Sequence, residues 1–363
     1  MKLIQVLRYC IILCIWGCNN TAPQDANAVE LNDIFKNDSI KVSGTTLFGP
    51  DQLNDPWVIR TMDTLLLVAN KKGDTVLDVY STSGKLIKRM VQRGKGTLNI
   101  RMAGYIQPDY IHDQFYLYDL FAHKILRFSL PDMLKDTAYD PELYATLDQD
   151  SVLDNTFDKA YVNGDRFIAE SHVPDGRLVT INRKLDQRRY FLSFPPKVDT
   201  SLTDLENSSL YSMGITFNQQ QTKMATATYA AGLLNILSVT SEGLNPVWSA
   251  EIYKVTGLKR MKMDNGDFIA HGGDAIAGYS DICATEKYIY AIFSGKRMRD
   301  GNNPFSSIVH VLTWDGKKRF KILLDKEINR LTVSQDDATM YGLSSNGNGE
   351  PEISAFPIGS HIK

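Results

Sequence analysis

Residues 288–293, Tyr-Ile-Tyr-Ala-Ile-Phe, form a short apolar run directly after the polar turn Ala-Thr-Glu-Lys at residues 284–287. A run of this length, rich in aromatic and β-branched residues and bounded by turn residues, is typical of a buried β-strand. A second run, Ser-Ile-Val-His-Val-Leu at residues 307–312, follows after a connection. The two runs predict neighbouring antiparallel strands of one small sheet.

The same pattern recurs along the whole chain. Comparable runs begin at residues 65, 115, 167, 224, 288 and 340, so successive starts are 50 to 64 residues apart. This period is longer than that of a helical solenoid and close to that of a propeller blade. Six cycles therefore predict an all-β protein, a six-bladed β-propeller of four-stranded antiparallel blades.

The last cycle is incomplete, because it ends at Ile358 without a fourth strand. Residues 39–47, Ser-Ile-Lys-Val-Ser-Gly-Thr-Thr-Leu, precede the first complete blade and have no blade of their own. We expect this N-terminal strand to complete the last blade, since a closed ring leaves no open sheet edge. Helix signals are weak and confined to residues 131–135 and 199–208.

The N-terminus has the form of a bacterial lipoprotein signal, with basic Lys2 and Arg8, an apolar run over residues 9–16 and the junction Gly17-Cys18. The apolar run is too short to span a bilayer as a helix. We predict a signal peptide over residues 1–17, lipidation at Cys18, a flexible tether over residues 18–32 and one propeller domain over residues 33–363. The predicted location is the bacterial cell envelope, with the lipid in the outer membrane.

With these features the chain resembles the TolB-like six-bladed β-propeller lipoproteins of Gram-negative bacteria. The resemblance rests on the lipidation signal and tether, on the glycine-rich step Gln-Arg-Gly-Lys-Gly-Thr-Leu at residues 92–98, and on residues 288–296. It implies a propeller over the whole mature chain and almost nothing about activity. Many related propellers have a proline and an acidic residue after the second glycine of the step, where this chain has Thr97 and Asn99.

The composition argues against a nucleic-acid partner and against stabilisation by internal disulfides. The formal net charge is −2, and the 40 basic residues are interspersed with the 42 acidic ones, so we expect no nucleic-acid partner. Three of the four cysteines lie within the first 18 residues. Cys283 is left in a strand-like segment, where a small buried hydrophobic residue is the expected role, and no internal disulfide is predicted.

No motif predicts catalytic residues, a cofactor or a metal site. The six histidines include no pair at the short spacing of a helical or finger-type metal site. The nearest approach to a ligand set is Asp264, Asp267, His271, Asp274 and Asp281, around two glycines at the entry to blade five. We interpret that stretch as a solvated loop of turn-forming residues.

The connection at residues 294–306, Ser-Gly-Lys-Arg-Met-Arg-Asp-Gly-Asn-Asn-Pro-Phe-Ser, is longer than its counterparts and basic. Connections from second to third strands share a face of a propeller with the steps between blades, and loops on a rigid scaffold often carry binding function. The candidate binding rim therefore comprises Arg93, Lys95, His271, Asp274, Lys296, Arg297, Arg299 and Asp300. The alternative is a merely solvated basic loop.

The preferred functional hypothesis is a non-catalytic envelope lipoprotein whose rim binds an envelope protein or a glycan. Arginine favours acidic ligands, because its guanidinium hydrogen-bonds carboxylates well. The alternative is a propeller-type enzyme, a lactonase-like hydrolase or a polysaccharide lyase, with its site in the central channel.

Overall fold

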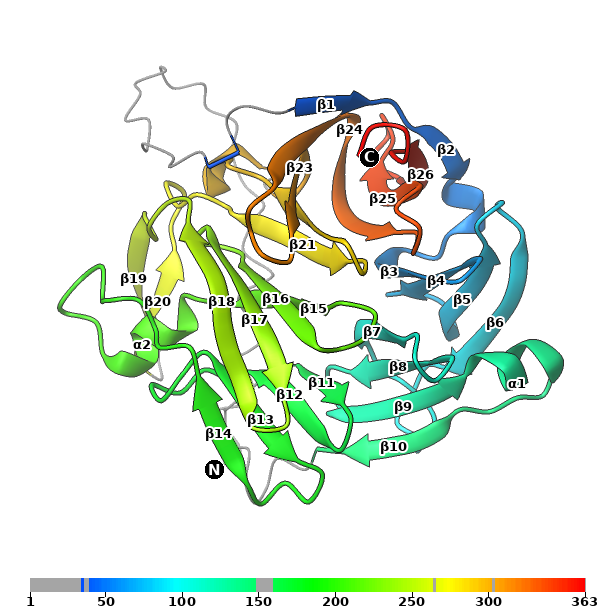
Figure 1. The fold of residues 1–363 in the computed structure, drawn as a ribbon, viewed down its shortest axis with the longest axis horizontal. Helices are drawn as coiled ribbons and strands as arrows, with labels where there is room; N and C mark the ends of the chain where they lie inside the picture. Colours follow the sequence, from blue (N-terminus) through cyan, green and yellow to red (C-terminus); the bar gives the residue numbers. More distant parts are fainter. Residues whose placement is uncertain (1–33, 36–38, 148–158, 264–265, 302–303, 363) are drawn as a thin grey trace.

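The computed structural model describes residues 34–35, 39–147, 159–263, 266–301 and 304–362. They form a ring of small antiparallel sheets around a central axis (Figure 1). Each of the six predicted apolar runs is the second strand of a blade, which confirms the period found in the sequence.

Four blades are separate sheets of four consecutive strands. Blade one contains β3 (Pro56–Met62), β4 (Leu65–Asn70), β5 (Thr75–Ser81) and β6 (Leu86–Gln92). Blade two contains β7 (Ala103–Asp109), β8 (Gln114–Asp119), β9 (Lys124–Ser129) and β10 (Glu142–Thr146). Blade three contains β11 (Ala160–Asn163), β12 (Arg166–Glu170), β13 (Leu178–Asn182) and β14 (Arg188–Phe191). Blade four contains β15 (Met213–Phe217), β16 (Lys223–Thr228), β17 (Leu233–Thr240) and β18 (Gly243–Glu251).

Blades five and six share one long strand, β24 (Arg319–Val333), and therefore belong to one eight-stranded sheet. The first part of β24 is the outer strand of blade five, which also contains β21 (Tyr279–Ala284), β22 (Tyr288–Phe293) and β23 (Ser306–Thr313). The last part of β24 is the inner strand of blade six, followed by β25 (Thr339–Ser345) and β26 (Pro351–Pro357).

The N-terminal segment closes the ring, as expected, but it does so in two pieces. β2 (Thr45–Phe48) pairs antiparallel with β26 and supplies the fourth strand of blade six. β1 (Ser39–Val42) instead pairs in parallel with β24, from Lys321 to Leu324, and gives blade five a fifth strand. The expectation of one continuous closing strand was therefore wrong for residues 39–42. A short 3-10 helix, η3 (Pro50–Gln52), follows β2 and leads to blade one.

The crossing from β1 to β2 depends on Gly44. A Cβ atom on Gly44 would lie 2.4 to 2.9 Å from ring carbons of Phe356, in β26. Real Cβ contacts are not this short, so the chain can pass over the Phe356 ring only where no side chain is present. The residue type at this position therefore lets the N-terminal segment reach both blades.

The hydrophobic core lies between neighbouring blades. Leu67 of β4 and Phe115 of β8, for example, are fully buried in one cluster that joins blades one and two. Phe35, from the segment ahead of β1, is 1% exposed within the cluster that joins blades four and five. Its ring stacks on His310 of β23 at a centroid distance of 3.9 Å. The core thus extends beyond the blades to the N-terminal segment.

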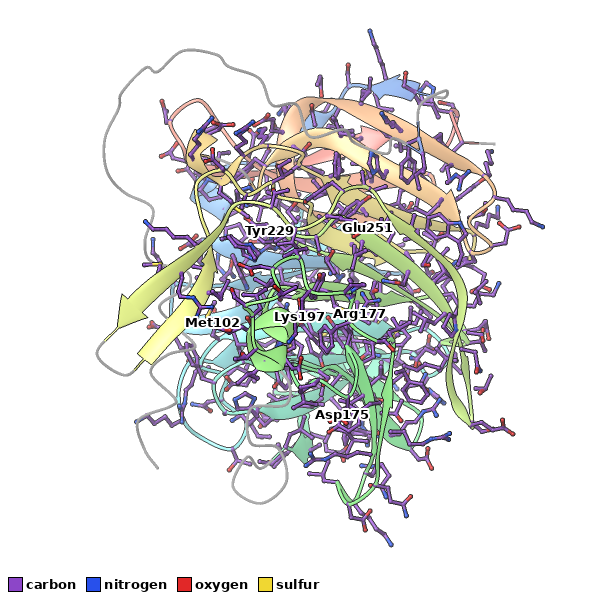
Figure 2. The ribbon with its side chains drawn as sticks, turned by 90° about the vertical axis from the view of Figure 1, so that its left-hand side faces the viewer. Met102, Asp175, Arg177, Lys197, Tyr229 and Glu251 are labelled. Carbon is purple, nitrogen blue, oxygen red and sulfur yellow. The ribbon has the colours of Figure 1, made fainter. Side chains whose placement is uncertain are left out.

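In the described residues, two short α-helices and one hairpin lie outside the blades. α1 (Leu130–Lys135) follows β9, with Ser129 as its N-cap, and α2 (Asp204–Ser209) precedes blade four with a capping box of Thr203 and Glu206. The hairpin of β19 (Leu258–Met263) and β20 (Gly266–His271) is inserted between blades four and five and projects from the ring (Figures 1 and 2). This hairpin corrects the interpretation of the stretch before blade five as a solvated loop.

The hairpin is fixed to α2 rather than free. Leu258 and Ile269 pack against the cluster that contains Leu210 and Tyr211, just after α2. Arg260 Nη1 lies 2.8 Å from Glu206 Oε1. These contacts join the hairpin to α2 and the residues that follow it. We call α2 and the β19–β20 hairpin together the wall. Within the described ranges, no helix has both the length and the apolar character needed to cross a membrane.

Candidate binding site on the loop face

The loop face is the side of the ring that carries the steps between blades and the connections from second to third strands. Arg93 hydrogen-bonds to one loop of each kind. Its Nη1 donates to the carbonyl of Arg101 at 2.7 Å, within the step from blade one to blade two, and its Nε donates to the carbonyl of Gly73 at 2.9 Å, within the connection of blade one. Its Nη2 donates to the carbonyl of Asn70 at 2.9 Å. Arg93 is therefore occupied in holding loops together.

The structure does not bring Arg93 and Lys95 near the other predicted rim residues. Both lie at the step between blades one and two, whereas the predicted basic loop belongs to blade five, across the ring (Figure 1). The sequence prediction was that topology would bring the blade-five loop beside Arg93 and Lys95, and the order of the blades does not place them together. Blades follow the ring in chain order, so these two groups lie well apart.

The blade-five loop is an extension of the β21–β22 hairpin. The amide of Met298 donates to the carbonyl of Ala275 at 2.8 Å, and the amide of Arg299 donates to the carbonyl of Gly273 at 2.9 Å. Nearer the sheet, the amide of Ala277 donates to the carbonyl of Lys296 at 2.9 Å. A short 3-10 helix, η4 (Met298–Asp300), ends this paired segment. The basic side chains are thus carried on hydrogen-bonded backbone.

Three predicted rim residues converge. Arg297 Nη1 lies 3.2 Å, and Arg299 Nη1 2.6 Å, from the same oxygen, Oδ1 of Asp274. The side chain of Asp274 is 64% exposed and that of Arg299 is 56% exposed, so these ion pairs contribute little to stability. Their effect is to orient two guanidinium groups around one carboxylate.

Of the remaining predicted rim residues, Lys296 and Asp300 form ion pairs, whereas Nδ1 of His271 is buried without a hydrogen-bond partner in the described structure. Lys296 Nζ lies 2.6 Å from Glu327 Oε1, and Arg299 Nε lies 3.9 Å from Asp300 Oδ1. The ring of His271 sits at the end of β20, and burial lowers its pKa, which favours the neutral imidazole. Cations and carboxylates are therefore interleaved on this loop, which is less positive than its sequence suggested.

Inside the central channel, the inner strands bring charges together. Arg60 of β3 donates to both carboxylate oxygens of Asp281 in β21, at 3.3 and 3.2 Å, and also to the carbonyl of Leu331 in β24 at 3.2 Å. Burial disfavours the charge of Arg60, but the Asp281 carboxylate outweighs this and raises the pKa of the guanidinium. The pair links blades one, five and six across the channel.

A second basic group lies at the mouth of the channel on the loop face. The guanidinium carbon of Arg330 lies 4.2 Å, and Nζ of Lys71 3.7 Å, from the ring centroid of Trp57. Arg330 Nε donates to the carbonyl of Trp57 at 2.9 Å. Burial, together with the nearby Arg330 charge, lowers the pKa of Lys71 although Asp55 opposes this. Burial also lowers the pKa of Arg330.

Tyr229 connects this mouth to the blade-five loop. It lies in the connection of blade four, and its hydroxyl donates to Sδ of Met298 at 3.6 Å. Burial raises the pKa of Tyr229, and the positive charge of Arg330 acts in the opposite direction. We call Trp57, Lys71, Tyr229, Met298 and Arg330 the channel mouth.

The candidate metal-ligand set from the sequence is dispersed. Asp274 lies on the rim with two arginines, and Asp281 lies in the channel with Arg60. Asp264 is outside the described residues, and Asp267 is described only through the backbone of β20. Across the described ranges, no group of three or more His, Cys, Asp or Glu side chains is arranged to hold a metal ion.

Sequence reasoning missed the channel mouth and Arg60. A signal was available, because Arg60 and Arg330 are charged residues next to buried apolar residues of two inner strands. An inner strand of a propeller faces the channel with alternate side chains. A charge at such a position therefore predicts a polar group in the channel.

Comparisons with known proteins agree with this architecture. The family model described as TolB-like 6-blade propeller-like matches residues 32–336. A protein of Bacteroides fragilis assigned as exported is 13% identical, with a TM-score of 0.50, covering 88% of this chain and 98% of its own. A member of the DUF4221 family from Bacteroides vulgatus is 10% identical, with a TM-score of 0.52, covering 87% of this chain and 98% of its own. No curated protein matches the sequence.

The two structural likenesses are at low identity and show the fold alone. The family match is broader evidence, because it covers most of the chain and begins where the predicted propeller begins. The chain belongs to the TolB-like six-bladed propeller family.

Proposed function

We propose that this protein is a non-catalytic, lipid-anchored protein of the bacterial envelope that binds a carboxylate-bearing ligand on its loop face. Anchoring is supported by the basic start, short apolar run and Gly17-Cys18 junction, followed by the polar tether of residues 18–32. Export is supported by the fold shared with an exported Bacteroides protein. The outer membrane is the proposed site of the lipid.

The observation that carries the binding proposal is the state of Arg299. Its Nη1 is held by Asp274 and its Nε lies 3.9 Å from Asp300 Oδ1, while its Nη2 makes no hydrogen bond within the described residues. The side chain is half exposed on backbone that is itself hydrogen-bonded. An oriented guanidinium whose Nη2 is unused is suited to donate to a ligand carboxylate at little entropic cost.

The channel ion pair supports a binding role over catalysis in the channel. Asp281 accepts from Arg60 and from the amide of Leu331 at 3.0 Å. A carboxylate held by these donors is suited to tie blades together.

The test removes the two rim arginines and measures ligand affinity. Arg297→Ala combined with Arg299→Ala should weaken binding of hexaglutamate, measured by isothermal titration calorimetry at low salt, at least fivefold. Thermal stability should stay the same, since exposed loop charges contribute little to folding.

A matched control is Lys317→Ala combined with Lys318→Ala, which removes the same charge from the connection before β24, away from the loop face. This control should change affinity less than twofold. Equal losses in both double variants would mean that only the overall charge matters, and the rim proposal would be abandoned.

A further inference from the structure

We infer that a cleft on the face opposite the loop face binds a phosphomonoester group, carried by a small soluble molecule such as a sugar phosphate or by a lipid headgroup. We call this side of the ring the turn face, because it carries the connections from first to second strands and from third to fourth strands. The site is separate from the rim and takes another ligand, so it stands or falls without the proposed function.

The cleft lies at the seam of blades four and five, which are neighbours in the ring (Figure 1). It is open to solvent and has a volume of about 410 Å³, comparable with that of small-molecule sites. Its walls are the turn before β16 in blade four and the turns that join β21 to β22 and β23 to β24 in blade five. The charged residues that line it are Lys223, Lys287, Lys317, Lys318, Glu286 and Asp315. We call it the turn cleft.

Lysines outnumber acids in the turn cleft. Four lysines and two acids give its lining a net charge of +2. Lys317 is paired, with its Nζ 3.5 Å from Asp315 Oδ2. Within the described ranges, Lys223, Lys287 and Lys318 form no ion pair. Three ammonium groups on one cleft are therefore available to an anion.

The other acids near these lysines accept from neutral donors. Nδ2 of Asn218 donates to both carboxylate oxygens of Glu286, at 3.3 and 3.2 Å. Lys287 also acts on the charge of the buried Asp337, but that carboxylate accepts from the Thr285 hydroxyl at 2.7 Å and does not line the cleft. Burial raises the pKa of Asp337, which disfavours its charge. In the described structure, neither carboxylate forms an ion pair with a lysine of the cleft.

Hydrogen bonds fix the turns of the cleft to one another. Nε1 of Trp314 donates to the carbonyl of Thr285 at 3.1 Å, which joins the two turns of blade five. Asn218 joins blade four to blade five through Glu286. The lysines therefore extend from backbone that a ligand does not need to order, and this lowers the entropic cost of binding.

A phosphomonoester fits this lining better than a carboxylate does. It carries a charge of about −1.5 to −2 at pH 7, which matches the net charge of the turn cleft. Its three terminal oxygens can accept from separate ammonium groups, whereas a planar carboxylate matches the fork of one arginine. A long polyanion is disfavoured, because Glu286 and Asp315 line the same cleft. A ligand on the rim does not reach the turn cleft, which lies on the opposite face.

The experiment measures binding of glucose 6-phosphate to the full chain by titration calorimetry at low salt, with glucose and glucuronate as probes that lack a phosphate. Lys287→Ala combined with Lys318→Ala should weaken glucose 6-phosphate binding at least fivefold. The matched control is Lys85→Ala combined with Lys184→Ala, which removes two lysines from connections between third and fourth strands in blades one and three. This control should change the affinity less than twofold.

Asp315→Asn tests the charge of the turn cleft by a gain of binding. Asparagine keeps an oxygen that can accept from the Thr313 hydroxyl and the Lys317 amide, so the turn stays formed while a negative charge is removed. The affinity for glucose 6-phosphate should rise at least twofold. An unchanged or lower affinity would contradict the role assigned to the lysine excess.

Phosphatidylcholine vesicles with added phosphatidic acid distinguish the two sources of the phosphomonoester. Binding of these vesicles that depends on Lys287 and Lys318, without binding of glucose 6-phosphate, would support the site and assign its ligand to a lipid. Binding of neither probe would overturn the inference, as would equal losses in the two lysine pairs or glucuronate binding as tightly as glucose 6-phosphate. Arg297→Ala with Arg299→Ala should leave glucose 6-phosphate binding unchanged, so the rim and the turn cleft are tested separately.

Discussion

Arg60 and Asp281 show how single charged residues organise a channel made from apolar strands. Each lies in an inner strand beside a buried isoleucine, Ile59 or Ile282, and their side chains are only 16% and 12% exposed. Placing one of these charges there alone would be costly, but as a hydrogen-bonded pair they are compensated. The pair also contacts the backbone of blade six, so three blades depend on it.

Breaking this pair should destabilise the ring. Asp281→Ala should lower the free energy of unfolding by about 3 kcal/mol or more, because it leaves the Arg60 charge without its partner. Replacing both residues, with Arg60→Met and Asp281→Leu, should cost less than Asp281→Ala alone. Urea denaturation monitored by tryptophan fluorescence measures both. If the double variant were the less stable one, the pair would be a net source of stability rather than a compensated charge.

At this scale, sequence patterns predicted some roles and not others. Cys283 is buried in β21, which confirms the expected role of a small core residue. Arg93 was expected on a binding rim, yet its donors go to backbone carbonyls, and no periodicity encodes that choice. The convergence of Arg297 and Arg299 on Asp274 depends on backbone pairing between residues far apart in any local pattern.

Among elements, the closing strands were the hardest to predict correctly. The alternation of side chains identified residues 39–47 as strand, but it could not state whether the partner runs parallel or antiparallel. The structure uses both arrangements, with β1 parallel to β24 and β2 antiparallel to β26. β24 continues from blade five into blade six because the chain bends there without leaving the sheet. The alternation of apolar and polar residues along a strand does not reveal such a bend.

Gly44 provides a test of the closure. Gly44→Ala should lower the free energy of unfolding by about 1–3 kcal/mol, because the new methyl group collides with the Phe356 ring and forces the crossing to shift. Gly49→Ala, at the position directly after β2 and with open space around it, should change stability by less than about 0.5 kcal/mol. Chemical denaturation compares them. A neutral Gly44→Ala variant would show that the closing segment tolerates displacement.

For the molecule as a whole, the repeat period predicted the fold well. Six cycles gave six blades because each blade must bury both faces of its sheet against its neighbours, and this demand fixes the spacing of apolar runs. The period also predicted the face on which each loop lies. It did not predict the segments inserted between blades, so the wall formed by α2 and the β19–β20 hairpin was unexpected.

Lipid anchoring predicts a simple fractionation result for the full-length chain. Cys18→Ala should remain soluble or unprocessed when wild-type protein partitions into the detergent phase of Triton X-114, because lipidation at Cys18 is the proposed attachment. Cys283→Ala is the matched control and should partition like wild type, since Cys283 is buried in the propeller. Mature Cys18→Ala protein in the detergent phase would contradict the anchor.

Phe35 determines which contact breaks first when the N-terminal segment is pulled. A pull on the chain ahead of residue 34 reaches this buried ring before it reaches β1 or β2. Extracting the ring requires the stack with His310 to open at the interface of blades four and five, away from the pairing of β2 with β26. The stack of Phe35 on His310 therefore resists the pulling force first. The pairing of β2 with β26, which closes the ring, bears the force only after the Phe35 ring has been extracted.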